Sequence, residues 1–118
     1  MTKKEIQSDD VSIISHTVKI EGNIYSDGNV RIDGNINGNI SVNGNLTIGD
    51  TSNITGEVKA TNVIMNGKIN GKVTADEKLK LESKAVLHGD LISKILVIEE
   101  GAYFQGNSKM KNNEGWFI

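Results

Sequence analysis

The sequence repeats itself at a fixed offset, which carries position 30 onto position 63 and position 46 onto position 79. The segment VRIDGNINGNISV at 30–42 matches VIMNGKINGKVTA at 63–75, and LTIGDTSNITGEVKA at 46–60 matches LKLESKAVLHGDLIS at 79–93. Each period divides once more, because a glycine recurs at every half period: Gly22, Gly38, Gly56, Gly71, Gly89 and Gly106. An apolar residue opens each unit at a similarly even spacing: Ile14, Val30, Leu46, Val63, Leu79 and Leu96. The chain therefore contains about six units of about 16–17 residues.

Each unit alternates apolar and polar residues in the manner of a half-buried β-strand. At 30–42 every second position is Val, Ile or Gly, and the residues between them are polar. A straight strand over this segment would span about 43 Å at about 3.3 Å per residue, which is too long for so small a domain. The unit must bend, and we expect it to form one coil of a parallel β-helix, with three short strands and three corners.

The predicted fold class is all-β: a single-domain parallel β-helix of about six coils, with a triangular aliphatic core and no capping helix. Proline is absent, aromatic residues make up 4% of the chain, and Ile, Val, Gly and Asn are abundant, which favours strands joined by tight turns. Parallel crossovers are predominantly right-handed, so we expect a right-handed coil. The predicted β-helix covers 14–108, between a mostly disordered N-terminal tail (1–13) and a C-terminal tail (109–118).

Three units carry extra residues between their opening residue and their glycine. The inserts are GDTSN (49–53), ESKA (82–85) and EEGA (99–102), and we expect them to form turns at one corner of coils three, five and six. By the same alignment His16 falls in the first unit, at an inward column that other units fill with Ile32, Ile48, Met65, Leu81 and Ile98.

The composition argues against several kinds of chemical site. Cysteine is absent, which excludes disulfides, thiolate metal sites and cysteine nucleophiles, and the net charge of −2 gives no bias toward nucleic acid. His16 is interpreted as a partly buried residue of the first coil and His88 as a solvated surface residue, because stacked coils form ladders rather than a pocket. We expect no enzymatic activity, no cofactor, no metal ion and no nucleic-acid partner.

The two ends of such a stack point to self-association. Each end of an uncapped β-helix exposes unpaired backbone groups and a slice of the apolar core. Residues predicted to form the polymer interface at the first coil are Ile14, Val18, Ile20 and Ile24. Those predicted for the last coil are Leu96, Ile98 and Phe104. If like ends pair, the resulting filament is non-polar, and if unlike ends pair, it is polar.

The pattern V-x-I-x-G-x-I-x-G-x-I at 30–40, and its counterpart at 63–73, resembles the bactofilin family of bacterial polymer-forming cytoskeletal proteins. The resemblance covers about 14–108. It implies a right-handed β-helix that assembles without nucleotide into non-polar filaments. It also implies a scaffold at the inner membrane that serves cell shape, cell-wall synthesis or polar organisation, with cell-wall or polarity proteins as partners.

The termini suggest where such a scaffold would meet lipid. Possible membrane or partner contacts are Lys3, Lys4, Ile6, Trp116, Phe117 and Ile118. The chain has no apolar run of about 18 residues and no secretory signal, so we expect a cytoplasmic protein that is peripheral to the inner membrane.

Two other classes of protein share this architecture. A left-handed β-helix acyltransferase would show hexapeptides at a strict period of about 18 residues and a catalytic histidine. A β-helical carbohydrate-binding module would need a groove lined with aromatic residues or converging acids. The shorter period of this chain argues against the first class, and the scarcity of aromatic residues argues against the second.

Overall fold

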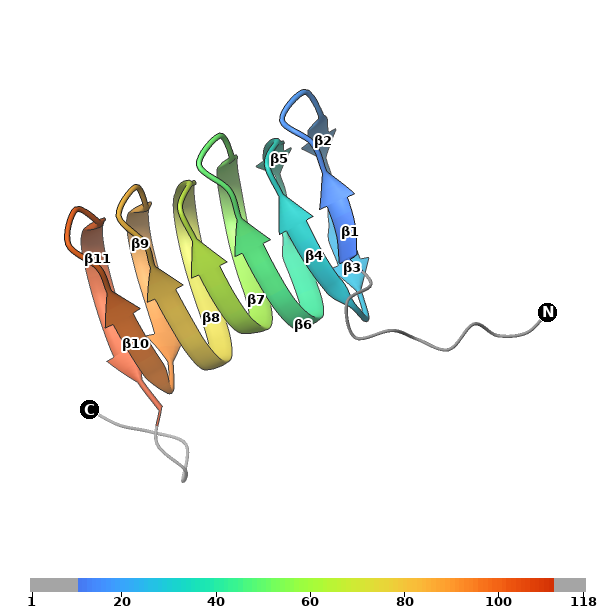
Figure 1. The fold of residues 1–118 in the computed structure, drawn as a ribbon. Coiled ribbons are helices and arrows are strands. Elements are labelled where there is room, and N and C mark those ends of the chain that lie inside the picture. Colours follow the sequence, from blue (N-terminus) through green and yellow to red (C-terminus); the bar gives the residue numbers. More distant parts are fainter. Residues whose placement is uncertain (1–10, 112–118) are drawn as a thin grey trace.

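The computed structural model describes residues 11–111, which form eleven strands and no helix (Figure 1). The strands are β1 (Val11–Ile14), β2 (Lys19–Glu21), β3 (Ile24–Ser26), β4 (Asn29–Ile32), β5 (Asn35–Asn37), β6 (Ile40–Ile48), β7 (Asn53–Met65), β8 (Lys68–Leu81), β9 (Val86–Ser93), β10 (Ile95–Ile98) and β11 (Tyr103–Met110). They wind into a β-solenoid of about six coils, which confirms the predicted all-β fold class.

The coils are joined by parallel pairing alone. Each strand before the last coil pairs in parallel with the segment one coil further along the chain, as β1 does with β4 and β9 with β11. The longer strands β6, β7 and β8 continue around a corner, where their pairing register shifts between Val42 and Asn45 and between Ala60 and Asn62. Each coil thus contributes one short segment to each of three sides.

We name these sides by the order of their segments within a coil. Face 1 consists of β1, β4, 45–48, 62–65, 78–81 and β10. Face 2 consists of β2, β5, 53–55, 68–70, 86–88 and 103–105. Face 3 consists of β3, 40–42, 58–60, 73–75, 91–93 and 108–110.

The pairing register gives the period directly. Ile32 aligns with Ile48, Ile48 with Met65, and Met65 with Leu81, so one inward column steps through positions 32, 48, 65 and 81. The first step of this column is longer, because Ile14 is the residue that aligns with Ile32. Ser12, and not Ile14, aligns with Val30 at the head of the opening column.

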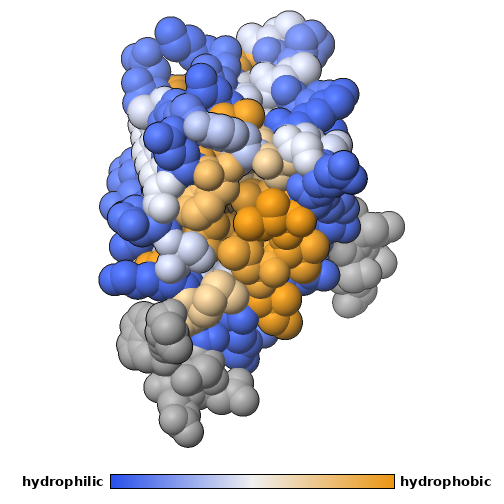
Figure 2. Space-filling model, turned by 90° about the vertical axis from the view of Figure 1, so that its left-hand side faces the viewer, coloured by the Kyte–Doolittle hydropathy of each residue, from blue (hydrophilic) through white to orange (hydrophobic). Residues whose placement is uncertain are grey.

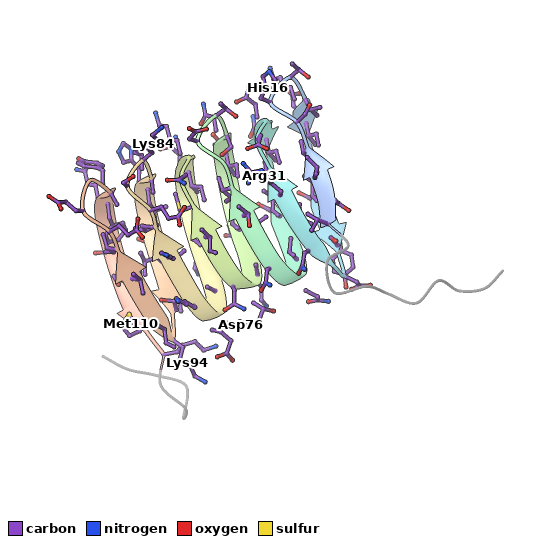
Figure 3. All side chains as sticks on the ribbon, in the orientation of Figure 1. His16, Arg31, Asp76, Lys84, Lys94 and Met110 are labelled. Carbon is purple, nitrogen blue, oxygen red and sulfur yellow. The ribbon has the colours of Figure 1, made fainter. Side chains whose placement is uncertain are left out.

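The extra length of the first step comes from a turn that the sequence alignment did not reveal. Val18 N donates a hydrogen bond to Ser15 O at 3.0 Å, as Ala85 N does to Glu82 O at 2.9 Å. The first coil therefore carries the same kind of turn as coils three, five and six. His16 lies in this turn and is exposed, so its predicted place in the inward column is wrong (Figure 3). The strands begin at Val11 and end at Met110, slightly outside the expected boundaries of 14 and 108.

The core is made of stacked aliphatic side chains. Its buried apolar residues are Val, Ile, Leu, Ala and one methionine, Met65, and Ser52 and Ser93 are buried beside them. The inward residues of the middle coils, such as Ile54 and Ile69, are completely buried. Removing each large apolar side chain from water in this thin interior stabilises the fold by about 1.5–3 kcal/mol. The alternation read from the sequence therefore places the core correctly.

Two kinds of ladder hold the corners. At the corner between faces 2 and 3 each coil has a glycine with φ between 136° and 154°. A Cβ on any of these except Gly22 would collide with the carbonyl oxygen of the glycine one coil below. At the start of face 1, Asn29 Oδ1 accepts a hydrogen bond from Asn45 N at 2.9 Å, and Asn62 Oδ1 accepts one from Lys78 N at 3.2 Å. Six of the thirteen glycines of the chain form the first ladder, and Asn29, Asn45 and Asn62 form the second.

Candidate assembly surfaces at the ends of the solenoid

The two ends of the solenoid are strand edges without a neighbour in the described part of the chain. In the first coil, β1, β2 and β3 pair only with strands of the second coil. In the last coil, β10 and β11 pair only with β8 and β9. Such edges present unpaired backbone N–H and C=O groups, which are a template for pairing with another chain.

The inward side chains of the terminal coils are uncovered where the same columns are buried elsewhere. Ile98 is 48% exposed, although its column mates Ile32, Ile48, Met65 and Leu81 are 0–1% exposed. The difference arises because no further coil of the described chain covers Ile98. An apolar side chain in a core column that remains half in water gains free energy when another layer covers it.

The end of the first coil brings together all four residues predicted for it. Ile14, Ile20 and Ile24 are half-buried and pack against the core. Val18 is 37% exposed. The next residue, Lys19, aligns with Asn35 of the second coil, so Val18 is level with Gly34. Val18 therefore lies at the turn corner of the same end surface.

The end of the last coil likewise contains the three residues predicted for it. Leu96 and Phe104 are half-buried against the core, beside the more exposed Ile98. Two further residues, Ala102 and Met110, lie in the same coil and are also half-buried. Figure 2 shows this end of the molecule as an apolar centre within a rim of hydrophilic residues. The sequence did not single out Ala102 and Met110, although their alignment with Ala85 and Ser93 could have done so.

The family model described as "Bactofilin: Polymer-forming cytoskeletal" matches residues 12–109. This chain belongs to the bactofilin family. The match spans the strands from within β1 to within β11, which is the whole solenoid but for its outermost residues.

A curated relative and a solved structure agree with this assignment. Bactofilin BacO of Myxococcus xanthus is 27% identical over 103 residues, which cover 87% of this chain and 82% of the relative. The structure of the cytoskeletal bactofilin BacA, obtained by solid-state NMR, is similar to this chain with a TM-score of 0.75 and 34% identity. That similarity covers 83% of this chain and 93% of the other.

The tail residues predicted to meet lipid or a partner lie outside the described part of this bactofilin. These residues are Lys3, Lys4, Ile6, Trp116, Phe117 and Ile118. Within 11–111 no helix has the length and apolar character needed to cross a membrane.

The polar side chains of this bactofilin form ladders on its sides. His88 lies half-buried on face 2, with its ring edge-on to Tyr103 at 5.5 Å between centroids. Among residues 11–111 there is no group of three or more side chains able to hold a metal ion.

The Tyr25 hydroxyl donates to Asp27 Oδ1 at 2.9 Å, and this bond together with the Asp27 charge raises the pKa of Tyr25.

Proposed function

We propose that this bactofilin assembles end to end, without a nucleotide, through the two end surfaces of its solenoid. The observation that carries the proposal is the exposure of core columns at both ends, most clearly the 48% exposure of Ile98. Docking a second coil on such an end would bury these side chains and pair the open strand edges at the same time. Both contributions are present in the folded chain, so no energy from nucleotide hydrolysis is needed.

We further propose that like ends pair, which gives a non-polar filament. Each contact is then isologous, with the same surface on both sides of a two-fold axis. The family resemblance supports this arrangement. The filament would act as a scaffold at the inner face of the cytoplasmic membrane, serving cell shape, cell-wall organisation or polar localisation. The described family function, polymer-forming and cytoskeletal, supports the scaffold role.

A substitution at one end tests both assembly and polarity. Phe104→Arg puts a charge on the end of the last coil, where docking would bury it without a partner. If like ends pair, this variant still joins through its first coil and stops at a dimer. If unlike ends pair, every contact needs one intact surface of each kind, and the same variant remains a monomer.

The matched control is Gln105→Arg, which adds the same charge at the next residue, on the outward side of face 2. Negative-stain electron microscopy and sedimentation velocity would be run without nucleotide for the wild type, Phe104→Arg, Ile20→Arg and Gln105→Arg. We expect filaments for the wild type and for Gln105→Arg, and dimers for the two end variants. A wild type that stays monomeric across salt and pH contradicts the assembly proposal, and filaments of Phe104→Arg contradict the role of the last coil.

Membrane contact through the tails is tested separately. Deletion of residues 1–10 or of 115–118, followed by co-sedimentation with anionic liposomes, assigns the contact to one terminus. Equal binding by both deletions and the wild type would mean that neither tail is responsible.

A further inference from the structure

The inward residues of the first coil read the same in both directions along the chain. The pairing register with the second coil identifies these residues as Ser12, Ile14, Ile20, Ile24 and Ser26. Ile20, on face 2, is the centre of this palindrome of residue types. The inward residues of the third coil, by contrast, begin with Leu46 and end with Ala60. A palindrome in an end coil matters, because two copies related by a two-fold axis run past each other in opposite directions.

The climb of the coil decides where such an axis passes. The chain advances steadily by about 4.8 Å per coil, so faces 1, 2 and 3 of the first coil lie at successive heights about 1.6 Å apart. Figure 1 shows β1 and β4 inclined in this way. Two such ends fit when the protruding face 1 of each copy meets the recessed face 3 of the other, and face 2, at middle height, meets itself. An axis through face 1 or face 3 instead leaves gaps that differ by about 4.8 Å between the sides.

We infer that two first coils dock with the two-fold axis through the middle of face 2, so that Ile20 of one copy meets Ile20 of the other. The inference deepens the end-to-end assembly proposed above and rests on it, because it describes how like ends pair. Strands run antiparallel across this junction, with β2 beside β2 and β1 beside β3. Ile14 then lies opposite Ile24, which places apolar side chains together. Ser12 lies opposite Ser26, which places hydroxyl groups together.

The backbone groups of the first coil fit this arrangement. Ile14 O accepts a hydrogen bond from Asp33 N at 2.7 Å. Ile24 N donates one to Asn39 O at 2.9 Å. The inward residues therefore turn their backbone groups toward the second coil, and the outward residues turn theirs toward the edge that no described strand covers. Across an antiparallel junction, inward residues such as Ile20 form the non-hydrogen-bonded pairs, whose Cα atoms lie about 4.5 Å apart.

The outward side chains of face 2 are complementary across the same axis. Lys19 precedes Ile20 and Glu21 follows it, so each lysine lies opposite the glutamate of the other copy. Within one copy Lys19 Nζ lies 3.6 Å from Glu21 Oε2, and both side chains are 69% exposed. Docking brings two such ion pairs together as an alternating square, in which no like charges lie directly opposite each other. Sliding the strands by two residues would oppose lysine to lysine or glutamate to glutamate, so the charges also select the register.

The most exposed apolar residues of this end meet in the same arrangement. Ile13 on face 1 is 66% exposed, and Tyr25 on face 3 is 68% exposed. Because Ile14 lies opposite Ile24, the outward Ile13 lies opposite Tyr25, and each side chain covers the other. The turn at 15–18 does not intervene, because His16 at its tip is exposed and points away from the coil (Figure 3).

Engineered disulfides test the position of the axis. The chain contains no cysteine, so every disulfide comes from an introduced residue. Directly opposed inward residues have Cα atoms within the range of about 4.4–6.8 Å that a disulfide needs. Ile14→Cys, Ile20→Cys and Ile24→Cys are made singly in the Phe104→Arg background, in which only first coils pair. Ile64→Cys, on the outward side of face 1, reports random collisions. Oxidised glutathione takes up the two electrons and two protons released by each pair of thiols.

We expect Ile20→Cys alone to give a disulfide-linked dimer in non-reducing gel electrophoresis, at least about tenfold more than Ile64→Cys gives. Ile14→Cys and Ile24→Cys should link only when the two variants are mixed. A linked dimer of Ile14→Cys alone, or of Ile24→Cys alone, overturns the inference, because it places the axis on face 1 or face 3. Linking of Ile20→Cys at the level of Ile64→Cys overturns it as well.

An exchange of charges provides a second test that needs no cysteine. In the Phe104→Arg background, Lys19→Glu opposes like charges twice across the axis and should raise the dimer dissociation constant by about tenfold. Lys19→Glu combined with Glu21→Lys should restore the value of the parent in sedimentation equilibrium. A double variant as weak as Lys19→Glu alone overturns the inference. A Phe104→Arg parent that stays monomeric contradicts both proposals, whereas dimers with the wrong disulfide pattern contradict this inference alone.

Discussion

Alanine at Gly71 tests how closely the coils approach at the glycine corner. Gly71 has φ +143°, and a Cβ there would collide with the backbone carbonyl oxygen of Gly56, far inside the 3.0 Å that real Cβ atoms keep. A backbone oxygen cannot rotate away in the manner of a flexible side chain. Relief therefore requires two coils to separate or the corner to change its conformation.

Two terms contribute to the expected loss. A non-glycine residue in this region of φ costs about 1–3 kcal/mol. Forcing an extra carbon into close-packed structure costs about 1–3 kcal/mol more. Together they lower the free energy of unfolding by about 2–6 kcal/mol, which is a large part of the roughly 5–15 kcal/mol available to a domain.

Two other glycines separate these terms. Gly22 has φ +136° but nothing within 4 Å of an added Cβ, so Gly22→Ala keeps the conformational cost alone, about 1–3 kcal/mol. Gly28 lies outside this φ region and also has nothing within 4 Å. Gly28→Ala should therefore leave stability unchanged or raise it by up to about 1 kcal/mol, through the lower entropy of the unfolded chain.

The assay is urea unfolding followed by far-ultraviolet circular dichroism. It is run on the Phe104→Arg background at several protein concentrations, because assembly would add stability by mass action. The expected order of unfolding free energies is Gly28→Ala above Gly22→Ala above Gly71→Ala. If Gly71→Ala were no less stable than Gly22→Ala, the close stacking of glycine on glycine would be refuted.

Three further substitutions test the core and one surface cluster. Ile69→Ala, at a completely buried position in the fourth coil, should lower the free energy of unfolding by about 2–5 kcal/mol, and a loss under about 1 kcal/mol would contradict the tight core. Ser93→Ala should raise the free energy of unfolding by about 1 kcal/mol, because Ser93 Oγ is buried and has no hydrogen-bond partner among the described residues. A decrease in the same urea assay would contradict this prediction. Tyr25 has a pKa raised above 10.0 by its hydrogen bond to Asp27 and by the Asp27 charge. Asp27→Asn should therefore lower the pKa of Tyr25. This pKa is measured by ultraviolet absorbance in a Tyr103→Phe background. Because folding raises the pKa of Tyr25, the neutral phenol stabilises the fold at pH values below the ordinary pKa of tyrosine. This stabilisation is lost as the pH rises through the folded-state pKa.

The sequence predicted the middle of the solenoid better than its beginning. From the second coil onward the glycine column and the alternation fix which residues point inward, and the pairing register follows those columns. In the first coil the turn at 15–18 has the sequence SHTV, without the glycine or acidic residues of the other turns. Because the other units open on an apolar residue at an even spacing, the sequence predicted Ile14 as the partner of Val30. The pairing register shows that this prediction is wrong and that the partner is Ser12.

The repeat by itself determined the fold class and the approximate number of coils, because period and alternation are local properties of the chain. Only the tertiary structure decided how far those ends are exposed, since the 48% exposure of Ile98 depends on the absence of a covering coil in the described chain. The outward position of Ile13, Ile64 and Ile95 on the same face 1 was also decided by the stacked coils. These residues are far apart in the chain, and a slip of one residue in the register would have turned them toward the core instead.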